Sequence, residues 1–175
     1  MARRTIVHLG NVGEGFEGEI ESKKTRDYSE RFPGFDFFGI DLKELADKPT
    51  SWRQVRADFL TGLDRFPDGS VDIITSDRAL GEFNRLAGTS GFEEYTKKVV
   101  EKAHAKLRPG GKLLFSVPGI LVQKIRPIVE DSPFDSERME IREFKKNEYA
   151  RTYWSEYKPA VGKIFQITLQ KRTKH

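Results

Sequence analysis

Residues 4 to 15 read RTIVHLGNVGEG, a run of strand-forming side chains that leads directly into a glycine-rich stretch. Three glycines fall within the eight positions from His8 to Gly15. Glycine adopts left-handed and other unusual backbone conformations without steric cost, so these residues predict a strand followed by a tight loop. Such a loop either cradles a ligand or only turns the chain, and the residues around it must decide between the two.

The composition is that of one folded domain, and we expect residues 1–175 to form it. The chain has 37% hydrophobic and 33% charged residues, and 175 residues can bury a core that needs no disulfide or structural metal. The absence of cysteine excludes disulfides, cysteine zinc sites and thiol nucleophiles, and we expect no metal site. The 31 basic and 27 acidic residues give a net charge of +4, which is compatible with an anionic partner such as RNA but does not indicate one.

The sequence gives no sign of membrane attachment or export. No apolar run approaches the roughly 18 residues of a membrane span. The apolar stretch that follows the first arginines is too short for the core of a signal peptide. We therefore expect a cytoplasmic protein.

Seven short apolar and β-branched runs predict seven strands. They are residues 4–9, 35–40, 53–57, 71–76, 112–117, 139–144 and 163–170. Segments 16–32 and 92–107 have helical character, and in the second the apolar side chains recur every three or four residues. This order predicts an α/β fold with a doubly wound, mostly parallel seven-stranded sheet, helices on both faces and an antiparallel pair of strands at the C-terminal edge.

In an open sheet of this kind, a ligand binds beyond the carboxyl ends of the strands, where the strand order reverses next to the first strand. The glycine-rich loop follows the first predicted strand, and the second, third and fourth end in GIDL, RADF and TSD. Asp41, at the second of these ends, is placed to accept hydrogen bonds from both hydroxyls of a ribose. An acid at a strand end can equally cap a helix or face solvent, so its position in the series carries the inference.

At these residues the sequence resembles the class I, Rossmann-like S-adenosylmethionine-dependent methyltransferases. The resemblance covers residues 5–119 and rests on HLGNVGEG, FFGIDL, VRADFLTGLDRFPDGSVDIITSDRALGEF and AHAKLRPGGKLLFSVPG. The most specific of these motifs is LRPGGKLLFSVP after an amphipathic helix, and the glycine loop is the least specific.

The resemblance implies S-adenosylmethionine as cofactor and a contact for each part of it. The loop residues Gly10, Asn11, Gly13 and Gly15 would pass under the methionine part, and Ser76 and Asp77 would border that part and the reacting methyl group. Asp41 would hold the ribose hydroxyls and Leu42 would lie against the adenine. Asp58 would accept from the adenine amino group, and the Phe59 amide would face a ring nitrogen.

A nicotinamide-dependent dehydrogenase is the competing interpretation, because it uses the same strand, glycine loop and acid. Its acid usually lies about 20 residues beyond the glycine fingerprint. Asp41 lies 41 − 15 = 26 residues beyond Gly15. No Tyr-x-x-x-Lys and no paired His and Asp appear where hydride transfer would need proton chemistry. The LRPGG motif then favours a methyltransferase.

The glycine loop departs from the family pattern at two places. His8 stands where the family usually has an acid, and Val12 interrupts the glycine spacing. We rank three roles for His8: a core histidine with a satisfied hydrogen bond, a cofactor contact, and a base. These departures keep open an alternative function, a degenerate methyltransferase-like module that binds the cofactor as a subunit of a larger assembly.

The catalytic residues and the methyl acceptor are not identified by the sequence. TSDRALGEFN lacks the Asn-Pro-Pro-aromatic signature of some amino-nitrogen methyltransferases; Asp77 and Glu82 are candidate proton acceptors, although a helix cap and a solvated helix face explain them better. The first strand begins by residue 5, so we expect an open acceptor side. Residues 138–175 hold ten basic and four acidic residues with several aromatics, which leaves RNA, a protein or a small molecule as acceptor. A homodimer or a partner subunit is equally compatible with the sequence.

Overall fold

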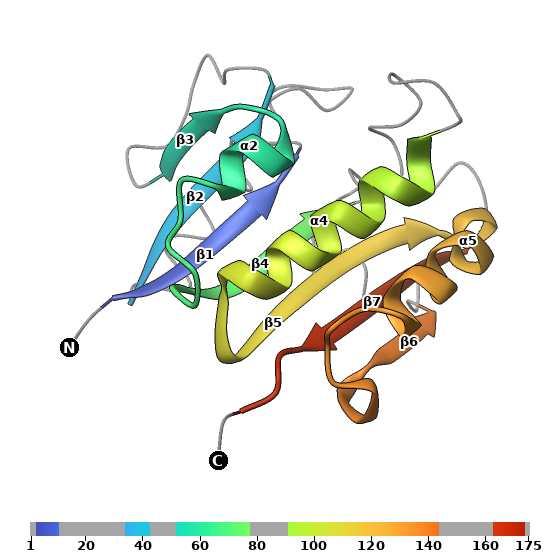
Figure 1. Ribbon diagram of the computed structural model, residues 1–175. Helices are drawn as coiled ribbons and strands as arrows, with labels where there is room; N and C mark the ends of the chain where they lie inside the picture. The colour runs from blue at the N-terminus through green and yellow to red at the C-terminus, as the bar shows by residue number, and fades with distance from the viewer. Residues whose placement is uncertain (1–2, 11–33, 43–51, 78–90, 144–162, 174–175) are drawn as a thin grey trace.

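The computed structural model describes residues 3–10, 34–42, 52–77, 91–143 and 163–173. These segments form one seven-stranded sheet with helices packed on it (Figure 1). The strands are β1 (Arg4–Leu9), β2 (Phe35–Asp41), β3 (Trp52–Arg56), β4 (Val71–Asp77), β5 (Leu107–Pro118), β6 (Glu140–Glu143) and β7 (Ile164–Gln170). The helices are α2 (Phe59–Leu63), α4 (Phe92–Lys106), α5 (Gly119–Glu130) and the short 3-10 helix η2 (Ser136–Arg138).

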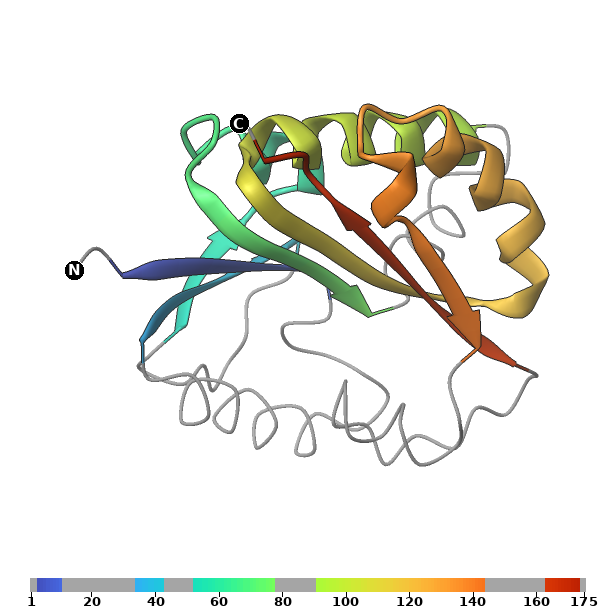
Figure 2. The same cartoon turned by 90° about the horizontal axis from the view of Figure 1, so that it is seen from below.

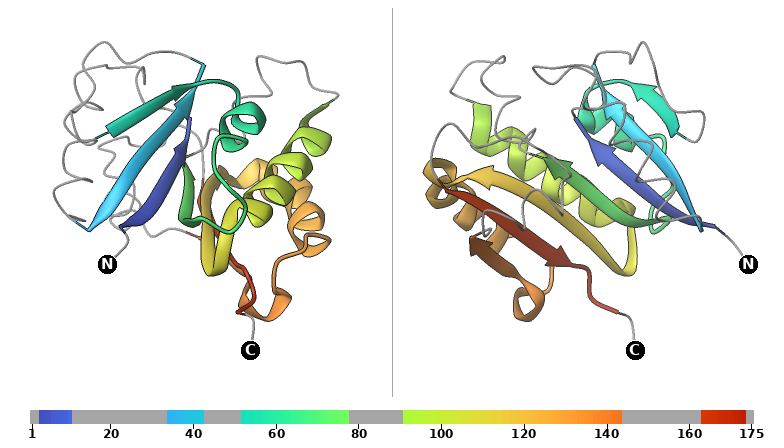
Figure 3. Two further views of the ribbon diagram at one scale, coloured as in Figure 1. Left: turned by 60° about the vertical axis from the view of Figure 1, so that its left-hand side comes forward. Right: turned by 180° about the vertical axis from the view of Figure 1, so that it is seen from behind.

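The strand order is β3-β2-β1-β4-β5-β7-β6. The first five strands pair in parallel, and β7 pairs antiparallel with both β5 and β6. Figure 3 shows from behind that β7 runs opposite to β5. The predicted mostly parallel sheet with an antiparallel C-terminal edge is therefore confirmed, and each of the seven predicted strands exists. β2 and β3 lie on one side of β1, and β4 and β5 lie on its other side. The switch point in strand order is therefore between β1 and β4.

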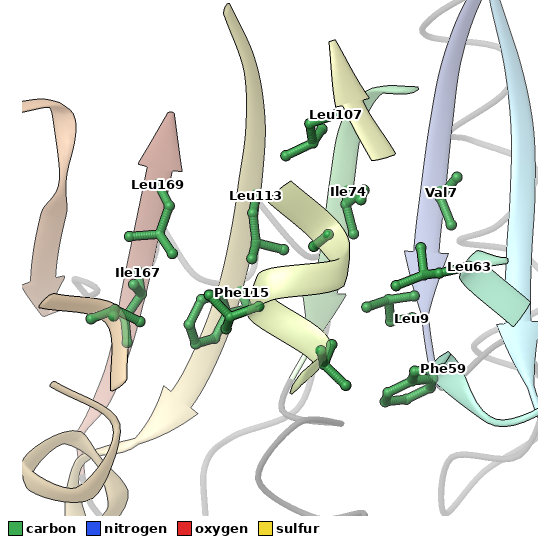
Figure 4. Packing of buried hydrophobic residues seen from close by; sticks show 14 of the residues in the cluster. Val7, Leu9, Phe59, Leu63, Ile74, Leu107, Leu113, Phe115, Ile167 and Leu169 are labelled. Carbon is green, nitrogen blue, oxygen red and sulfur yellow. The ribbon is translucent and has the colours of Figure 1, made fainter. Parts of the chain in front are cut away.

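Helices α2, α4 and α5 cover one face of the sheet (Figure 2). Alternate residues of the central strands point to this face and form the main core with the helices, among them Val7, Leu9, Ile74, Leu113 and Phe115 (Figure 4). A smaller cluster of Ile6 and Phe37 lies on the opposite face. β1 buries Val7 and Leu9 on one face and Ile6 on the other, which explains the apolar residues at consecutive positions of this run. The helix expected over residues 16–32 lies outside the described residues.

Two elements differ from the expectation. Strand β5 begins at Leu107, directly after α4, so the LRPGG segment belongs to the strand. The pairing of β4 with β5 shifts in register between Val71 and Ile73, opposite this segment. Gly110 adopts a φ of 79° there and its N–H donates to the Lys171 carbonyl at 3.0 Å. Helix α5 follows β5 immediately and was not predicted. It buries Val122, Ile125, Ile128 and Val129 and contains Pro127.

Candidate functional site

The carboxyl ends of β1, β2 and β3 lie next to one another, because these strands are parallel neighbours in the sheet. Gly10 follows β1 and has a φ of 78°, a conformation in which a side chain would be strained. Its N–H donates to the Ile40 carbonyl at 2.9 Å, so the turn that leaves β1 is fixed to the end of β2. The first glycine of the loop is therefore required by the backbone. Asn11, Gly13 and Gly15 lie outside the described residues.

Asp41 is the last residue of β2, and Leu42 follows it. The Asp41 carbonyl accepts from the Ala57 N–H at 2.9 Å, which ties the end of β2 to the end of β3. Its side chain is partly exposed. Leu42 is 47% exposed, one of two large hydrophobic side chains in the described residues that remain exposed. A carboxylate and an apolar side chain thus stand together at the strand end, where the sequence predicted contacts to a ribose and an adenine.

Asp58, after β3, is the N-cap of α2. Its Oδ1 accepts from the N–H groups of Leu60 at 2.9 Å and Thr61 at 3.1 Å. Burial raises the pKa of this carboxyl, but the hydrogen bonds from Thr61 and Leu60 outweigh it and hold the pKa below its usual value. The helix-capping role weighed against the cofactor role is therefore real. The two roles are compatible, since an ionised carboxylate has about four acceptor positions and the side chain is partly exposed.

Phe59 begins α2 and is fully buried, so its ring belongs to the core and only its backbone could reach a ligand. Tyr95, in the first turn of α4, packs against the same core. Burial raises the pKa of the Tyr95 hydroxyl to about 12. The sequence showed Tyr95 only as one of the apolar positions on the buried face of α4. A phenol on such a face is itself a signal, because a buried hydroxyl needs a polar partner.

At the end of β4, the Ser76 side chain bonds to the protein itself. Ser76 is fully buried, and its hydroxyl donates to the Leu9 carbonyl at 3.1 Å. This bond joins the ends of β4 and β1 and stabilises the switch point. Asp77 is the last residue of β4. Contacts of Ser76 and Asp77 with a cofactor stay predictions, and Glu82 lies outside the described residues.

His8 has a defined place in the sheet. Its Nδ1 is 2.7 Å from the Thr75 Oγ1 on the neighbouring strand β4, a hydrogen-bond distance. The ring is partly buried on the face opposite the main core. This geometry agrees best with a core histidine that has a satisfied hydrogen bond, the first of the three roles considered.

The described residues hold no group of three or more histidine, aspartate or glutamate side chains that could bind a metal ion. Nor does any helix in these segments have the length and apolar character needed to cross a membrane.

This chain resembles known proteins in its structure but not detectably in its sequence. No family model matches the sequence, and no curated protein matches it significantly. A SAM-dependent methyltransferase from Archaeoglobus fulgidus superposes with a TM-score of 0.64 at 12% identity, over 97% of this chain and 86% of that one. The 16S rRNA (adenine(1408)-N(1))-methyltransferase from Catenulisporales acidiphilia gives 0.58 at 11%, over 99% and 90%.

A third similar structure is phosphoethanolamine N-methyltransferase 2 from Haemonchus contortus, in complex with phosphomonomethylethanolamine and S-adenosylhomocysteine. It superposes with a TM-score of 0.62 at 15% identity, over 98% of this chain. The chain spans 49% of the length of that enzyme. At these identities the similarity establishes the fold, which is that of S-adenosylmethionine-dependent methyltransferases, as the sequence motifs predicted.

Proposed function

We propose that this protein is an S-adenosylmethionine-dependent methyltransferase that binds its cofactor across the ends of β1, β2 and β3. The observation that carries the proposal is the placement of Gly10, Asp41 and Asp58 at three neighbouring parallel strand ends beside the switch point. Similar solved structures hold S-adenosylmethionine or S-adenosylhomocysteine on this fold. The donor set also fits such a molecule, because carboxylates accept from hydroxyls and amino groups and an exposed leucine can cover a base.

In this proposal the residues of the chain bind and orient the cofactor. Gly10 turns the backbone at the end of β1 toward the methionine part. Its φ of 78° is a conformation in which a side chain would be strained, so glycine is needed there. Asp41 accepts from the two ribose hydroxyls, Leu42 covers one face of the adenine, and Asp58 accepts from the adenine amino group. When bound, S-adenosylmethionine supplies an electrophilic methyl group on a sulfonium.

Methyl transfer is an in-line displacement that depends mainly on the placement of the acceptor. Held by these residues, the cofactor would offer its methyl carbon to an acceptor atom in line with the carbon–sulfur bond, and the electron pair of that bond would stay on sulfur. The acceptor then releases its proton to solvent or to a base. We assign no catalytic residue, because a base is needed only for an acceptor that must lose its proton as it reacts.

The acceptor stays open between RNA, a protein and a small molecule. The basic excess of residues 138–175 was the main sequence argument for RNA. Within the described part of this segment, Arg138, Arg142 and Lys163 each form an ion pair with a nearby acid, and Lys171 donates to helix carbonyls. These cations therefore have structural partners, which favours the interpretation of this region as an edge hairpin.

Calorimetry with S-adenosylmethionine and S-adenosylhomocysteine tests the cofactor assignment. We expect binding to the wild type and a loss of at least about tenfold in affinity for Asp41→Ala, because two hydrogen bonds to a charged group are lost. Asp36→Ala is the matched control: Asp36 lies on β2 at the opposite end from Asp41 and should leave the affinity unchanged. No binding, or binding that Asp41→Ala does not weaken, would overturn the proposal.

A second experiment distinguishes an enzyme from a binding module. The protein is incubated with a cell extract and labelled S-adenosylmethionine, with and without ribonuclease. Label that ribonuclease removes identifies RNA as acceptor, and label that persists indicates a protein or a small molecule. Tight cofactor binding with no transfer to any fraction would favour the alternative, a degenerate module that acts within an assembly.

A further inference from the structure

The arginines near the outermost strand β3 differ from those on the other side of the sheet. β3 is at one end of the strand order, beside β2 and then β1 (Figure 1). Four exposed arginines lie on or next to these strands, and we call them the arginine surface: Arg4 on β1, Arg53 and Arg56 on β3, and Arg65 after α2. Among the described residues, none of the four forms an ion pair with an acid.

Arginines on β5, α5, η2 and β6 have acidic partners instead. The pairs are Arg108 with Asp72 at 2.7 Å, Arg126 with Glu130 at 3.4 Å, Arg138 with Asp135 at 3.7 Å, and Arg142 with Glu140 at 3.6 Å. The arginine surface therefore carries positive charge that no ion pair in the described part of the chain balances. Charge of this kind is available to an anionic partner.

Aromatic rings support the helix-covered side of the arginine surface. The Arg53 guanidinium lies over the ring of Phe38, its register partner on β2, at 5.6 Å from the ring centroid. The Phe66 ring packs edge-on against Phe38 at 5.0 Å between centroids, so Arg65, the residue before Phe66, lies on the same side of the sheet. A guanidinium that stacks on a ring keeps its N–H groups available in its plane, which suits the oxygens of a phosphate.

The arginine surface follows the strands and reaches both faces of β3. Arg4 pairs with Phe35 at the start of β2, and Arg56 pairs with Asp41, which is 41 − 35 = 6 residues further along β2. The arginines therefore extend over about 20 Å along the strands. Arg53 and Arg56 are three positions apart on β3, so their side chains point to opposite faces. A planar membrane cannot contact both faces at once, whereas a flexible chain of phosphates can follow the strand.

We propose that the arginine surface is a docking surface for single-stranded RNA. Contacts between arginines and phosphates supply most of the affinity of proteins that bind nucleic acids without sequence preference. The inference goes beyond the proposed cofactor function and does not depend on it, because none of the four arginines is assigned to the cofactor. An RNA strand bound here lies beside the carboxyl ends of β2 and β3, where we place the cofactor.

The test measures binding of a labelled oligouridine of about 12 nucleotides by fluorescence anisotropy over a series of salt concentrations. The variant is Arg53→Gln/Arg65→Gln, which removes two exposed cations. We expect its Kd to be at least about tenfold higher than that of the wild type. The slope of log K against log salt should fall by about 1.4, since each lost phosphate contact on a single strand contributes about 0.7.

Arg126→Gln/Arg138→Gln is the matched control. It removes the same amount of charge from two arginines that have acidic partners and whose side chains are 48% and 46% exposed. It should leave the affinity for the oligouridine within about twofold of the wild type. Calorimetry with S-adenosylhomocysteine on the same preparations should give the wild-type affinity for both double variants.

The outcomes separate this inference from the cofactor function. Oligouridine that does not bind to the wild type, or that both double variants weaken equally, overturns the inference and leaves the cofactor function standing. A wild type that binds oligouridine but not S-adenosylhomocysteine overturns the cofactor function alone.

Two other roles of the arginines would also overturn the inference. Charged side chains on an outer strand can serve only to prevent pairing with a second sheet. In that case Arg53→Gln/Arg65→Gln would self-associate in analytical ultracentrifugation and bind oligouridine as the wild type does. A membrane partner would appear as cosedimentation with vesicles of phosphatidylcholine and phosphatidylserine that this variant loses, with oligouridine binding unchanged.

Discussion

The acidic residues at the two ends of the parallel strands have different roles. We call the side of the sheet where these strands begin the amino edge, and the side where they end the carboxyl edge. At the amino edge, the buried Asp72 accepts from the Thr5 N–H at 2.7 Å and pairs with Arg108 at 2.7 Å. At the carboxyl edge, the side chains of Asp41 and Asp58 are partly exposed. Asp72 thus serves the connections between strands, whereas Asp41 and Asp58 keep access to solvent at the ends of two neighbouring strands. The comparison indicates that the acid at the amino edge is buried in contacts that hold the sheet together, whereas the acids at the carboxyl edge stay partly accessible.

The comparison has a physical basis in the sheet itself. Parallel strands place their carboxyl ends, and the loops that follow them, at one edge. At the amino edge the chain leaves a helix or turn and enters the next strand. Polar groups there are therefore used for hydrogen bonds within turns and helix ends. Substitutions at the amino edge should therefore alter stability without altering ligand affinity. Those at the carboxyl edge should alter affinity more than stability.

The largest expected effect is from Asp72→Ala at the amino edge. The substitution leaves the Thr5 N–H without its acceptor and removes the ion pair with Arg108, whose side chain is 48% exposed and can turn to solvent. We expect the free energy of unfolding to fall by about 2–3 kcal/mol, most of it from the partly buried Thr5 amide that loses its acceptor. Urea unfolding followed by circular dichroism measures it.

Asp36→Ala is the control at the same edge. Asp36 pairs with Arg3 at 3.1 Å, but the Arg3 side chain is 63% exposed, so the pair should contribute less than about 1 kcal/mol. Equal losses for Asp36→Ala and Asp72→Ala would contradict the assignment of a special role to Asp72. A change in cofactor affinity for Asp72→Ala, measured on folded protein, would contradict the separation of the two edges.

Gly62→Ala in α2 should have the next largest effect, and it tests the carboxyl edge through packing. An added Cβ would overlap Ile40 Cγ2 and lie 3.0 Å from its Cδ1, and Ile40 is fully buried. We expect a loss of about 1–2 kcal/mol, since overpacking outweighs the better helix propensity of alanine. Ile40 immediately precedes Asp41, so cofactor affinity should fall as well.

Gly34→Ala provides the matched glycine. A Cβ there meets no atom within 4 Å, and the substitution should be neutral or slightly stabilising. If Gly62→Ala lowered stability but left the affinity unchanged, the position of Asp41 would not depend on the packing of α2 against β2.

The sheet could be predicted from the sequence because its strands carry strong local signals. The runs RTIVHL and VDIITS place apolar residues on both alternating faces, and the structure assigns strands at Arg4–Leu9 and Val71–Asp77. The elements that were missed have weak local signals. Helix α5 contains Pro127 and follows a strand without a connecting loop, and the start of β5 is hidden in a Pro-Gly-Gly sequence that usually marks a turn.

The site could be predicted only at the level of strand ends. That Asp41 and Asp58 come together follows from the strand order. The capping of α2 by Asp58 and the bond from Ser76 to the Leu9 carbonyl depend on distances between segments that are far apart in the chain. A residue type shows that a polar group needs a partner, but it does not show whether the protein or a ligand provides it.

Lys171→Met should have a smaller effect, again confined to stability. The Lys171 Nζ donates to the carbonyls of His104 at 2.8 Å and Leu107 at 2.7 Å, at the C-terminal end of α4. Methionine keeps the length of the side chain but removes the charge and its donors, so we expect a loss of about 1 kcal/mol in the free energy of unfolding. The pKa of His104, which burial and then the charge of Lys171 hold below its usual value, should rise in the variant. A titration of the His104 ring by NMR measures the shift, and an unchanged pKa would show that Lys171 does not act on this end of the helix.

The smallest expected effect is the pH dependence of Asp58→Asn, which tests how the carboxyl edge serves the fold. The hydrogen bonds of the α2 cap hold the Asp58 pKa below 3.8 in the folded state, so the ionised side chain stabilises the fold above that pH. The contribution is lost as the pH falls through the lowered folded-state pKa, because the carboxyl then binds a proton. Asparagine also caps helices but does not titrate, and wild type and variant should differ by less than about 1 kcal/mol at pH 7. Their unfolding free energies, measured in urea between pH 7 and pH 2, should converge as the pH falls. A difference that stays constant over this range would mean that the Asp58 charge contributes nothing to the fold, and that its function lies wholly with the ligand.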